Sequence, residues 1–197
     1  MTLNSNDATL EPKLFMVLLG SKAPKRNVEQ HDYFFGIGNS LKDLVPQMQA
    51  FWPEAGKSLH VDGWRLVTNV DGYRIRVREK DSQPAERDNG LRLFFINLGG
   101  YSQGRLEEQH YTVLSVHPDK ALAMKDSKQT VFFKETSVKG ANSHIDEKYG
   151  IDVDDVYRIE EILSSALKSA FEIHIADTKE NHDEDEIHLG YFKLDKL

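Results

Sequence analysis

Residues 13–31, KLFMVLLGSKAPKRNVEQH, recur as RLFFINLGGYSQGRLEEQH at residues 92–110. The offset between the two stretches is constant at 79 residues, and eight of the nineteen aligned residues are identical. Each copy contains a short apolar run that ends at a glycine, which is typical of a strand buried on both faces. The sequence therefore predicts that one structural unit occurs twice in the chain.

A second aligned stretch extends this duplication. HVDGWRLVTNVDGYRI at residues 60–75 matches HIDEKYGIDVDDVYRI at residues 144–159 at six of sixteen positions, with an offset of 84. FWPE at 51–54 over FFKE at 132–135 gives an intermediate offset of 81. The drift predicts an insertion of about five residues within the second copy.

The repeats divide the chain into segments. We expect a loose N-terminal tail at residues 1–12, repeat 1 at 13–78, a linker at 79–91, repeat 2 at 92–176, and an acidic loop with a C-terminal strand at 177–197. The linker contains the Pro, Gly and charges of EKDSQPAERDNG. FEIHIA and IHLGYFKLD flank a polar tip at the end of the chain, a pattern that predicts a terminal hairpin.

Each repeat has the pattern of a β-β-α-β-β unit. After the second strand, Asn39 or Ser40 is placed to cap a helix, which Pro46 should kink and Pro53 should end. The apolar stripe of this helix comprises Leu41, Leu44, Val45, Met48, Phe51 and Trp52. In the second copy, residues 153–163 fit a strand or a helix. The expected fold is α+β, with two duplicated halves packed about a pseudo-twofold axis because each half alone is too small for a stable core.

Composition excludes several classes of site. The chain has 197 residues, no cysteine and a net charge of −7. Thiolate chemistry, disulfides and Cys-ligated zinc are therefore excluded, and the acidic balance argues against nucleic acid as a partner. The N-terminus lacks the pattern of a signal peptide and no apolar run reaches membrane-span length, so we expect a cytoplasmic protein that does not bind membranes.

The quoted segments resemble a bacterial family known as domain of unknown function 1543. The resemblance includes EQHDYFFGIGNSLKDLVPQMQAFWPEA and SHIDEKYGIDVDDVY, and covers most of residues 13–163. The resemblance implies one or two copies of the module per chain. It implies no activity, cofactor or catalytic residue.

Two duplicated motifs carry ionisable groups. EQH places Glu29 beside His31 and Glu108 beside His110, and a carboxylate two residues from an imidazole on a strand can orient it for acid–base work. The structural alternative, which we favour, is a buried polar pair inherited with the fold, with His31 and His110 substantially buried. The second motif is His-x-Asp, which occurs at residues 60–62 and 144–146 and supplies candidate metal ligands. Two ligands do not make a site, and no metal is expected. These ligands are His60, Asp62, His144 and Asp146.

Two further stretches are candidates for anion binding. Gly36 and Gly38 lie between a strand and a helix start, where free N–H groups attract anions, but we favour a plain turn with a cap, since most short glycine motifs are only that. YRIRVRE alternates Arg74, Arg76 and Arg78 with apolar residues. Three arginines in line can bind an anion, but such a row is more often a solvated strand face or a charged edge strand.

No nucleophile, cofactor loop or complete metal set emerges from these motifs. The sequence therefore favours a binding or interaction module for an unknown protein or small ligand, without a cofactor. The sequence does not determine its oligomeric state. The alternative is a hydrolase or lyase that depends on His and carboxylate groups, with or without a metal ion.

Overall fold

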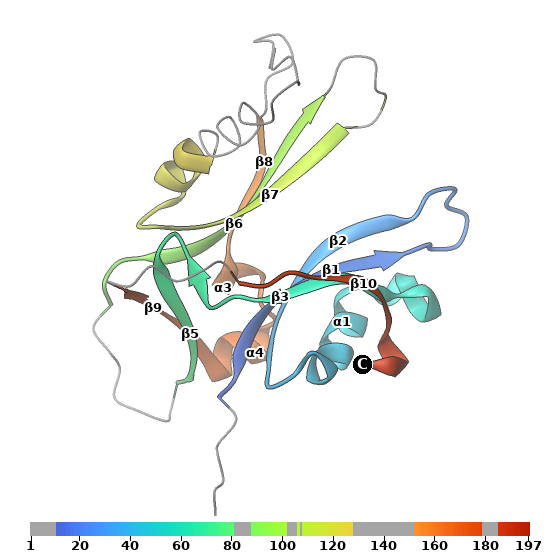
Figure 1. Cartoon of the computed structure of the whole chain (residues 1–197), viewed down its shortest axis with the longest axis horizontal. Helices are drawn as coiled ribbons and strands as arrows, with labels where there is room; N and C mark the ends of the chain where they lie inside the picture. Colours follow the sequence, from blue (N-terminus) through green and yellow to red (C-terminus); the bar gives the residue numbers. More distant parts are fainter. Residues whose placement is uncertain (1–10, 81–87, 102–105, 107, 128–151, 179–184) are drawn as a thin grey trace, which may run out of the picture.

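The structure is a computed structural model that describes residues 11–80, 88–101, 106, 108–127, 152–178 and 185–197. Its strands and helices follow one another along the chain as shown in Figure 1. The strands are β1 (Lys13–Ser21), β2 (Gln30–Gly38), β3 (His60–Leu66), β4 (Asn69–Val70), β5 (Tyr73–Glu79), β6 (Arg92–Tyr101), β7 (Glu108–His117), β8 (Asp152–Arg158), β9 (Phe171–Asp177) and β10 (His188–Lys193). The helices are η1 (Leu41–Leu44), α1 (Val45–Phe51), η2 (Pro53–Ser58), α3 (Ile159–Ile162), α4 (Ser165–Ala170) and η3 (Leu194–Lys196), and residues 120–127 after β7 are also helical.

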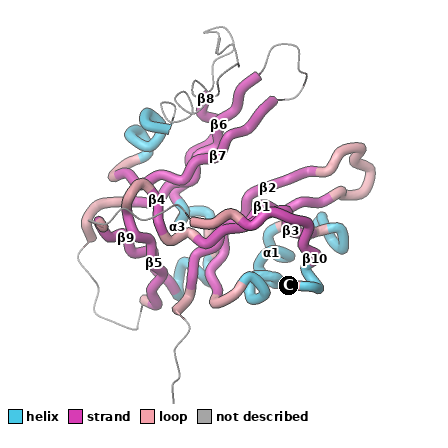
Figure 2. Tube along the Cα trace, viewed as in Figure 1, coloured by secondary structure: helices cyan, strands magenta, loops and turns pink. Residues whose placement is uncertain are grey.

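The strands form antiparallel sheets. The orders are β10-β3-β1-β2, β7-β6-β8 and β4-β5-β9 (Figure 2). β1 and β6 each have a neighbour on both sides, as their continuous apolar runs predict. The expected α+β class, with mostly antiparallel sheets and few helices, is confirmed.

The two faces of β1 serve different cores. Val17 and Leu19 point toward the helical side, where they pack with Leu44 and Met48. Leu14 and its neighbours on the other face pack with residues of β6, β7 and β5 in a second core. In that core the rings of Phe35 in β2 and Phe95 in β6 lie 5.1 Å apart, edge to face. The two halves of the chain therefore share apolar surface.

The helix after β2 begins where the sequence predicts. The Ser40 side chain accepts from the N–H of Asp43, while the Asp43 carboxylate accepts from the N–H of Ser40, which together form a capping box. The first turn is a 3-10 helix, and Pro46 lies in the first turn of α1, where a missing N–H costs nothing. The helical stretch changes type before Pro46, so the expected kink becomes a junction of two short helices.

The expected terminal hairpin is wrong. β9 pairs with β5, so that Ile175 lies opposite Ile75, whereas β10 pairs with β3 in another sheet. Alternation along each segment identified both strands, but it contains no information about which sheet edge each strand completes. A carboxylate between them, that of Asp185, fixes the chain after β9 to the backbone of Thr68 and Asn69.

The second half follows the repeat pattern only in part. Residues 153–163 resolve into the strand β8, up to Arg158, and the helix α3 from Ile159. β8 takes beside β6 the place that β3 takes beside β1, because Gly20 pairs with His60 and Gly99 with Asp152. The strand pairing thus relates residues 60–66 to 152–158, an offset of 92 that replaces the expected 84. His144 and Asp146 lie outside the described residues.

We predict that Asp185→Asn lowers the free energy of unfolding by about 2 kcal/mol, because hydrogen bonds to a charged acceptor are the strong ones. The Asp185 carboxylate accepts from Thr68 Oγ1 at 2.5 Å, from the Thr68 N–H at 2.7 Å and from the Asn69 N–H at 3.1 Å. Urea unfolding measures the change. Asp195→Asn, in an exposed side chain near the C-terminus, is the matched control. Equal stability of the two variants would contradict the prediction.

Candidate functional site

Four ionisable side chains predicted as two separate pairs lie together in the structure. Gly20 of β1 pairs with His31 of β2 on one edge and with His60 of β3 on the other. A bulge in β3 between the partners of Leu18 and Leu19 leaves Asp62 unpaired in the ladder and turns its carboxylate toward Gly20. Glu29, just before β2, completes the set. We call Glu29, His31, His60 and Asp62 the histidine–carboxylate ring.

Carboxylates and imidazoles alternate around this ring. The Nε2 atom of His60 lies 3.1 Å from Glu29 Oε1 and 3.2 Å from Asp62 Oδ1. The Nε2 atom of His31 lies 3.0 Å from Asp62 Oδ2 and 4.0 Å from Glu29 Oε2. The groups contact one another in pairs. Within the described residues, no three such side chains form a ready-made metal cluster.

His60 is the buried member of the ring, with 3% of its side chain exposed. Its Nδ1–H donates to the carbonyl oxygen of Ser58 at 2.8 Å, because a carbonyl can only accept. The hydroxyl of Ser58 is itself anchored by Ser21 and by the Ala55 carbonyl, each at 2.7 Å. The Nε2 atom, by contrast, is buried without a hydrogen bond of acceptable geometry.

His31 is the accessible member. Its side chain is 45% exposed, so the expectation of a substantially buried imidazole is wrong. His31 lies near the start of β2, an edge strand of its sheet, where solvent reaches it from the unpaired side. An accessible imidazole held by a carboxylate has the geometry of a group that can exchange protons with a ligand.

Gly20 makes room for the ring. A Cβ atom at this position would lie 2.5 Å from His60 Nε2 and would also overlap the Asp62 carboxylate. The glycine that ends the apolar run of β1 is therefore a requirement of the site and not only of the strand. Sequence reasoning took it as a boundary, because nothing in the chain order places it under His60.

A related cluster lies in the second half. His110 Nε2 is 3.9 Å from Glu108 Oε2, and His110 Nδ1 is 3.4 Å from Asp154 Oδ2. The side chain of His110 is 51% exposed, so the expectation of its burial is also wrong. The Asn97 amide donates to Asp154 at 3.3 Å. β8 has Asp152 where β3 has His60, so this cluster has no imidazole in the place of the buried one.

The candidate anion site at Gly36 and Gly38 has its donors in use. The N–H groups of Asn39 and Ser40 both donate to the Asp43 carboxylate, at 3.1 and 2.9 Å. The helix that follows is a 3-10 turn of four residues. The local geometry is that of a cap.

The arginine row alternates as the sequence predicts. Ile75 and Val77 are buried, while Arg74 and Arg76 are exposed on the opposite face of β5. β9 places Glu172 opposite Arg78. Of the three arginines, Arg78 alone has a carboxylate opposite it on β9, since Arg76 lies opposite His174 and Arg74 opposite Ala176. Anion binding there stays a prediction.

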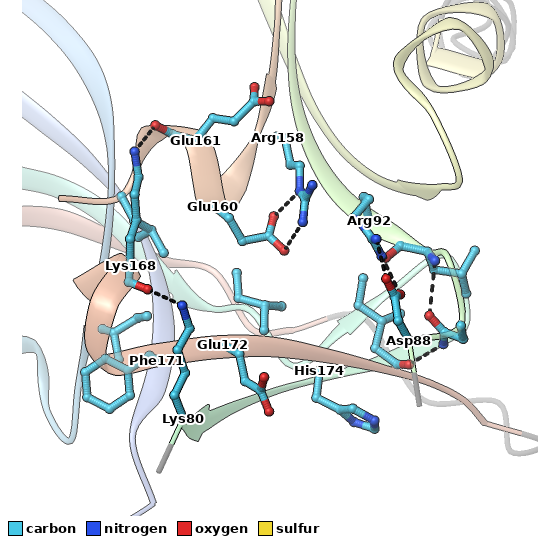
Figure 3. Close-up of a pocket in the computed structure, with 16 residues that line it drawn as sticks. Lys80, Asp88, Arg92, Arg158, Glu160, Glu161, Lys168, Phe171, Glu172 and His174 are labelled. Atoms are coloured by element: carbon cyan, nitrogen blue, oxygen red, sulfur yellow. Dashed lines mark hydrogen bonds and ion pairs between the residues drawn. The ribbon is translucent and has the colours of Figure 1, made fainter. Parts of the chain in front are cut away.

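One cavity of about 500 Å³ lies away from the ring, between α3, α4, β9 and the start of β6 (Figure 3). Its walls carry the cations Lys80, Arg92, Arg158 and Lys168. Lys80 donates to the Lys168 carbonyl and Lys168 to the Glu161 carbonyl, each at 2.5 Å, while Arg158 bonds to Glu160 at 3.0 and 3.2 Å. These cations are held by the protein itself, which gives the cavity little attraction for an anionic ligand.

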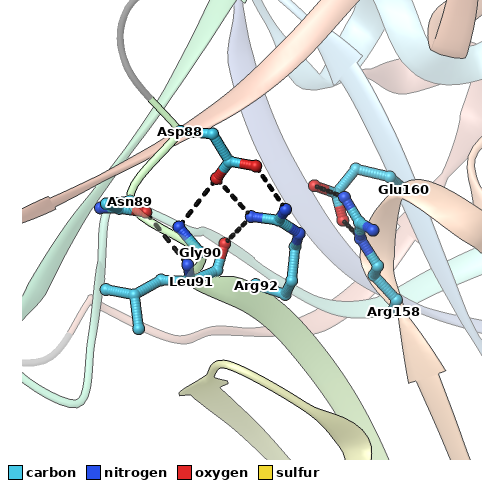
Figure 4. Close-up of polar contacts among 7 residues, drawn as sticks. All are labelled: Asp88, Asn89, Gly90, Leu91, Arg92, Arg158 and Glu160. Carbon is cyan, nitrogen blue, oxygen red and sulfur yellow. Dashed lines mark hydrogen bonds and ion pairs between the residues drawn. The ribbon is translucent and has the colours of Figure 1, made fainter.

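Arg92 forms the strongest of these contacts. Its Nη1 and Nη2 atoms donate to the two Asp88 oxygens at 2.8 and 2.6 Å, and Asp88 also accepts from the Gly90 N–H (Figure 4). These donors hold the pKa of the Asp88 carboxyl far below its usual range, and the same contact raises the pKa of Arg92. The contacts of Asp88 with Gly90 and Arg92 stabilise the turn that leads into β6.

Comparison with known proteins agrees with this architecture. The crystal structure of protein Il1583 from Idiomarina loihiensis aligns over 93% of this chain and 99% of that chain, with a TM-score of 0.60 and 22% sequence identity. The likeness is one of fold. A search of curated proteins finds no match. None of the helices in the described residues is long and apolar enough to cross a membrane.

The expected family resemblance is confirmed for one copy. The matched segment runs from the loop before β2 into β5 and contains all four residues of the histidine–carboxylate ring. Residues 26–77 of this chain match the family described as Domain of Unknown Function (DUF1543).

Proposed function

We propose that the histidine–carboxylate ring is an acid–base site of the hydrolase or lyase class, with His31 as the group that exchanges protons with substrate. The observation that carries this proposal is the pairing of an accessible imidazole with a carboxylate, at 3.0 Å, above a buried second imidazole. This combination favours the enzyme alternative over a purely structural polar pair.

We assign a role to each nitrogen of His31. Nε2 lies 3.0 Å from Asp62 Oδ2, an oxygen without a hydrogen bond of acceptable geometry in the structure, and a rotation of the exposed ring would let Nε2–H donate to it. The Nδ1 atom of the neutral ring is then an acceptor that can take a proton from a substrate or a water. A carboxylate that fixes the tautomer of a catalytic histidine has the same role in other acid–base sites. Asp62 is thus a positioning residue and His31 the acid–base group.

The rest of the ring holds Asp62 in place. Asp62 reaches His31 through Oδ2 and His60 through Oδ1. The backbone carbonyl of Ser58 orients His60, so its Nε2 atom has a fixed place beside the carboxylate, and a proton on Nε2 would let it hold Asp62. A surface histidine without such support would sample many orientations and would be a poorer acid–base group.

A binding module without turnover is the second candidate. Leu189 and Tyr191 of β10 are 77% and 64% exposed, and the Tyr191 ring lies 4.3 Å from the His60 ring. Exposed apolar and aromatic groups beside a polar cluster are typical of ligand sites. Such a protein would use the same surface, with His31 as a hydrogen-bonding group.

We also propose that the two halves arose by duplication in a cytoplasmic bacterial protein and are related by a pseudo-twofold axis. The register supports a duplication, since Gly20 lies opposite His31 in the first half and Gly99 opposite His110 in the second, at the expected offset of 79. A bulge also occurs at the corresponding point of both central ladders. The absence of cysteine fits a reducing compartment.

We predict that His31→Asn lowers turnover of chromogenic ester and phosphoester substrates about 10²- to 10⁴-fold, the usual contribution of a general acid or base. Gly20→Ala should cause a similar loss, because a Cβ there displaces His60 and Asp62. The matched controls are His110→Asn and Gly99→Ala, which change the second cluster alone. Turnover retained in His31→Asn would refute the assignment, and no turnover of any substrate would favour the binding module.

The ring also predicts unequal effects on stability. His60→Ala should lower the free energy of unfolding by about 2 kcal/mol, because it leaves the Ser58 carbonyl without its donor and removes a buried ring that packs beside Tyr191. His31→Ala should cost less than about 0.5 kcal/mol, since its side chain is half exposed. Urea unfolding of both variants beside His110→Ala provides the comparison. Equal losses for His31 and His60 would instead indicate that the whole ring is structural.

A further inference from the structure

The buried imidazole of His60 lacks a partner at one nitrogen. Because Nδ1–H donates to the Ser58 carbonyl, the Nε2 atom of the neutral imidazole carries a lone pair and no hydrogen. The nearest atoms of the histidine–carboxylate ring are two carboxylate oxygens, one of Glu29 and one of Asp62. A lone pair that faces two anions is unfavourable, and a buried polar atom without a hydrogen bond costs about 1–3 kcal/mol. A positive charge in front of Nε2, either a proton or a metal ion, would remove this conflict.

The donor set suits a divalent transition-metal ion. Two imidazole nitrogens and two carboxylates are ligands that Zn²⁺ and related ions accept, and the two carboxylates balance the charge of the ion. Three of the four neighbouring donor pairs in the ring lie 3.0–3.2 Å apart, and the fourth, His31 with Glu29, lies 4.0 Å apart. Ligands that bind Zn²⁺ at about 2.0–2.1 Å in a tetrahedron lie about 3.3 Å apart, between these two values.

The surroundings of His60 also resemble those of a metal ligand. A histidine that binds a metal through one nitrogen commonly donates its other N–H to a backbone carbonyl or carboxylate. The Ser58 carbonyl has this role here, and the Ser58 hydroxyl is fixed by Ser21, which is fully buried. His60 is therefore oriented before any ion arrives.

The other ligands are free to adjust. The side chains of Glu29 and His31 are 41% and 45% exposed, so each can rotate about its side-chain bonds without disturbing a core. In the structure these groups contact one another in pairs. Small rotations of the exposed pair would open the ring around an ion held by His60 and Asp62.

We propose that Glu29, His31, His60 and Asp62 together bind one Zn²⁺-like divalent ion, with His60 as the buried anchor. The inference deepens the proposed function and rests on it for any catalytic role of the ion. Bound at this place, the ion would supply Lewis acidity; His31, bound through Nε2, would then carry its proton on Nδ1 and act as a ligand, so its acid–base role belongs to the ion-free ring. The second cluster should bind more weakly, because Asn97 contacts Asp154 and no imidazole occupies the place of His60.

The test is a titration of the full chain, stripped of metals with a chelator, with Zn²⁺ and separately with Mn²⁺ in a calorimeter. We expect one ion per chain. Glu29→Gln, a change at a half-exposed side chain, and His60→Gln should each weaken binding at least 10-fold. Glu108→Gln and His110→Gln are the matched controls in the second cluster and should keep the wild-type affinity. Circular dichroism of each variant in chelator shows whether it remains folded.

The outcomes separate this inference from the proposed function. Binding of one ion that is weakened by Glu29→Gln but not by Glu108→Gln supports the site, whether or not turnover is found. Absence of binding at millimolar Zn²⁺ and Mn²⁺, or equal binding by Glu29→Gln and wild type, overturns it. Turnover that persists in chelator would retain the acid–base function and reject only a catalytic role for the ion.

Discussion

The antiparallel pairing of β1 with β2 on one edge and β3 on the other is the constraint on which the site depends. Gly20 is the residue of β1 that both neighbours meet, with His31 on one side and His60 on the other. The space left by its missing side chain is filled by the ionisable groups of β3, His60 and Asp62. Backbone hydrogen bonds thus fix the ring before any side-chain interaction contributes.

Burial divides the ring into two parts with different physical properties. His60 is surrounded by protein, so its orientation is set by one backbone carbonyl and its unpartnered nitrogen is costly. His31 lies at an edge strand, where water competes for its hydrogen bonds and a ligand can reach it. A site that is rigid on one side and accessible on the other can bind without reorganising the core.

The cavity and the ring illustrate why size does not identify a site. The cavity walls contain many charged groups, but the cations among them are satisfied by contacts such as those of Arg92 with Asp88 and Lys168 with a backbone carbonyl. The first of these contacts lies in the turn before β6, and the second joins α4 to α3. The ring is smaller, but it contains a polar atom that the protein leaves without a partner, and such an atom indicates a ligand more directly than volume does.

The sequence by itself determined the strands, the cap at Ser40 and the identities of the ionisable groups, because periodicity and capping are local properties that act over a few residues. It also placed Glu29 beside His31, and His60 beside Asp62. Only the tertiary structure brought these two pairs together, since strand register and the bulge at Asp62 join residues about thirty positions apart. Tertiary pairing likewise placed β9 and β10 in different sheets. It also made residues 152–158, at an offset of 92, the counterpart of residues 60–66 in the second half, where the sequence alignment predicted an offset of 84. Many sheet edges satisfy the same alternating pattern, and the choice among them depends on the packing of the whole core.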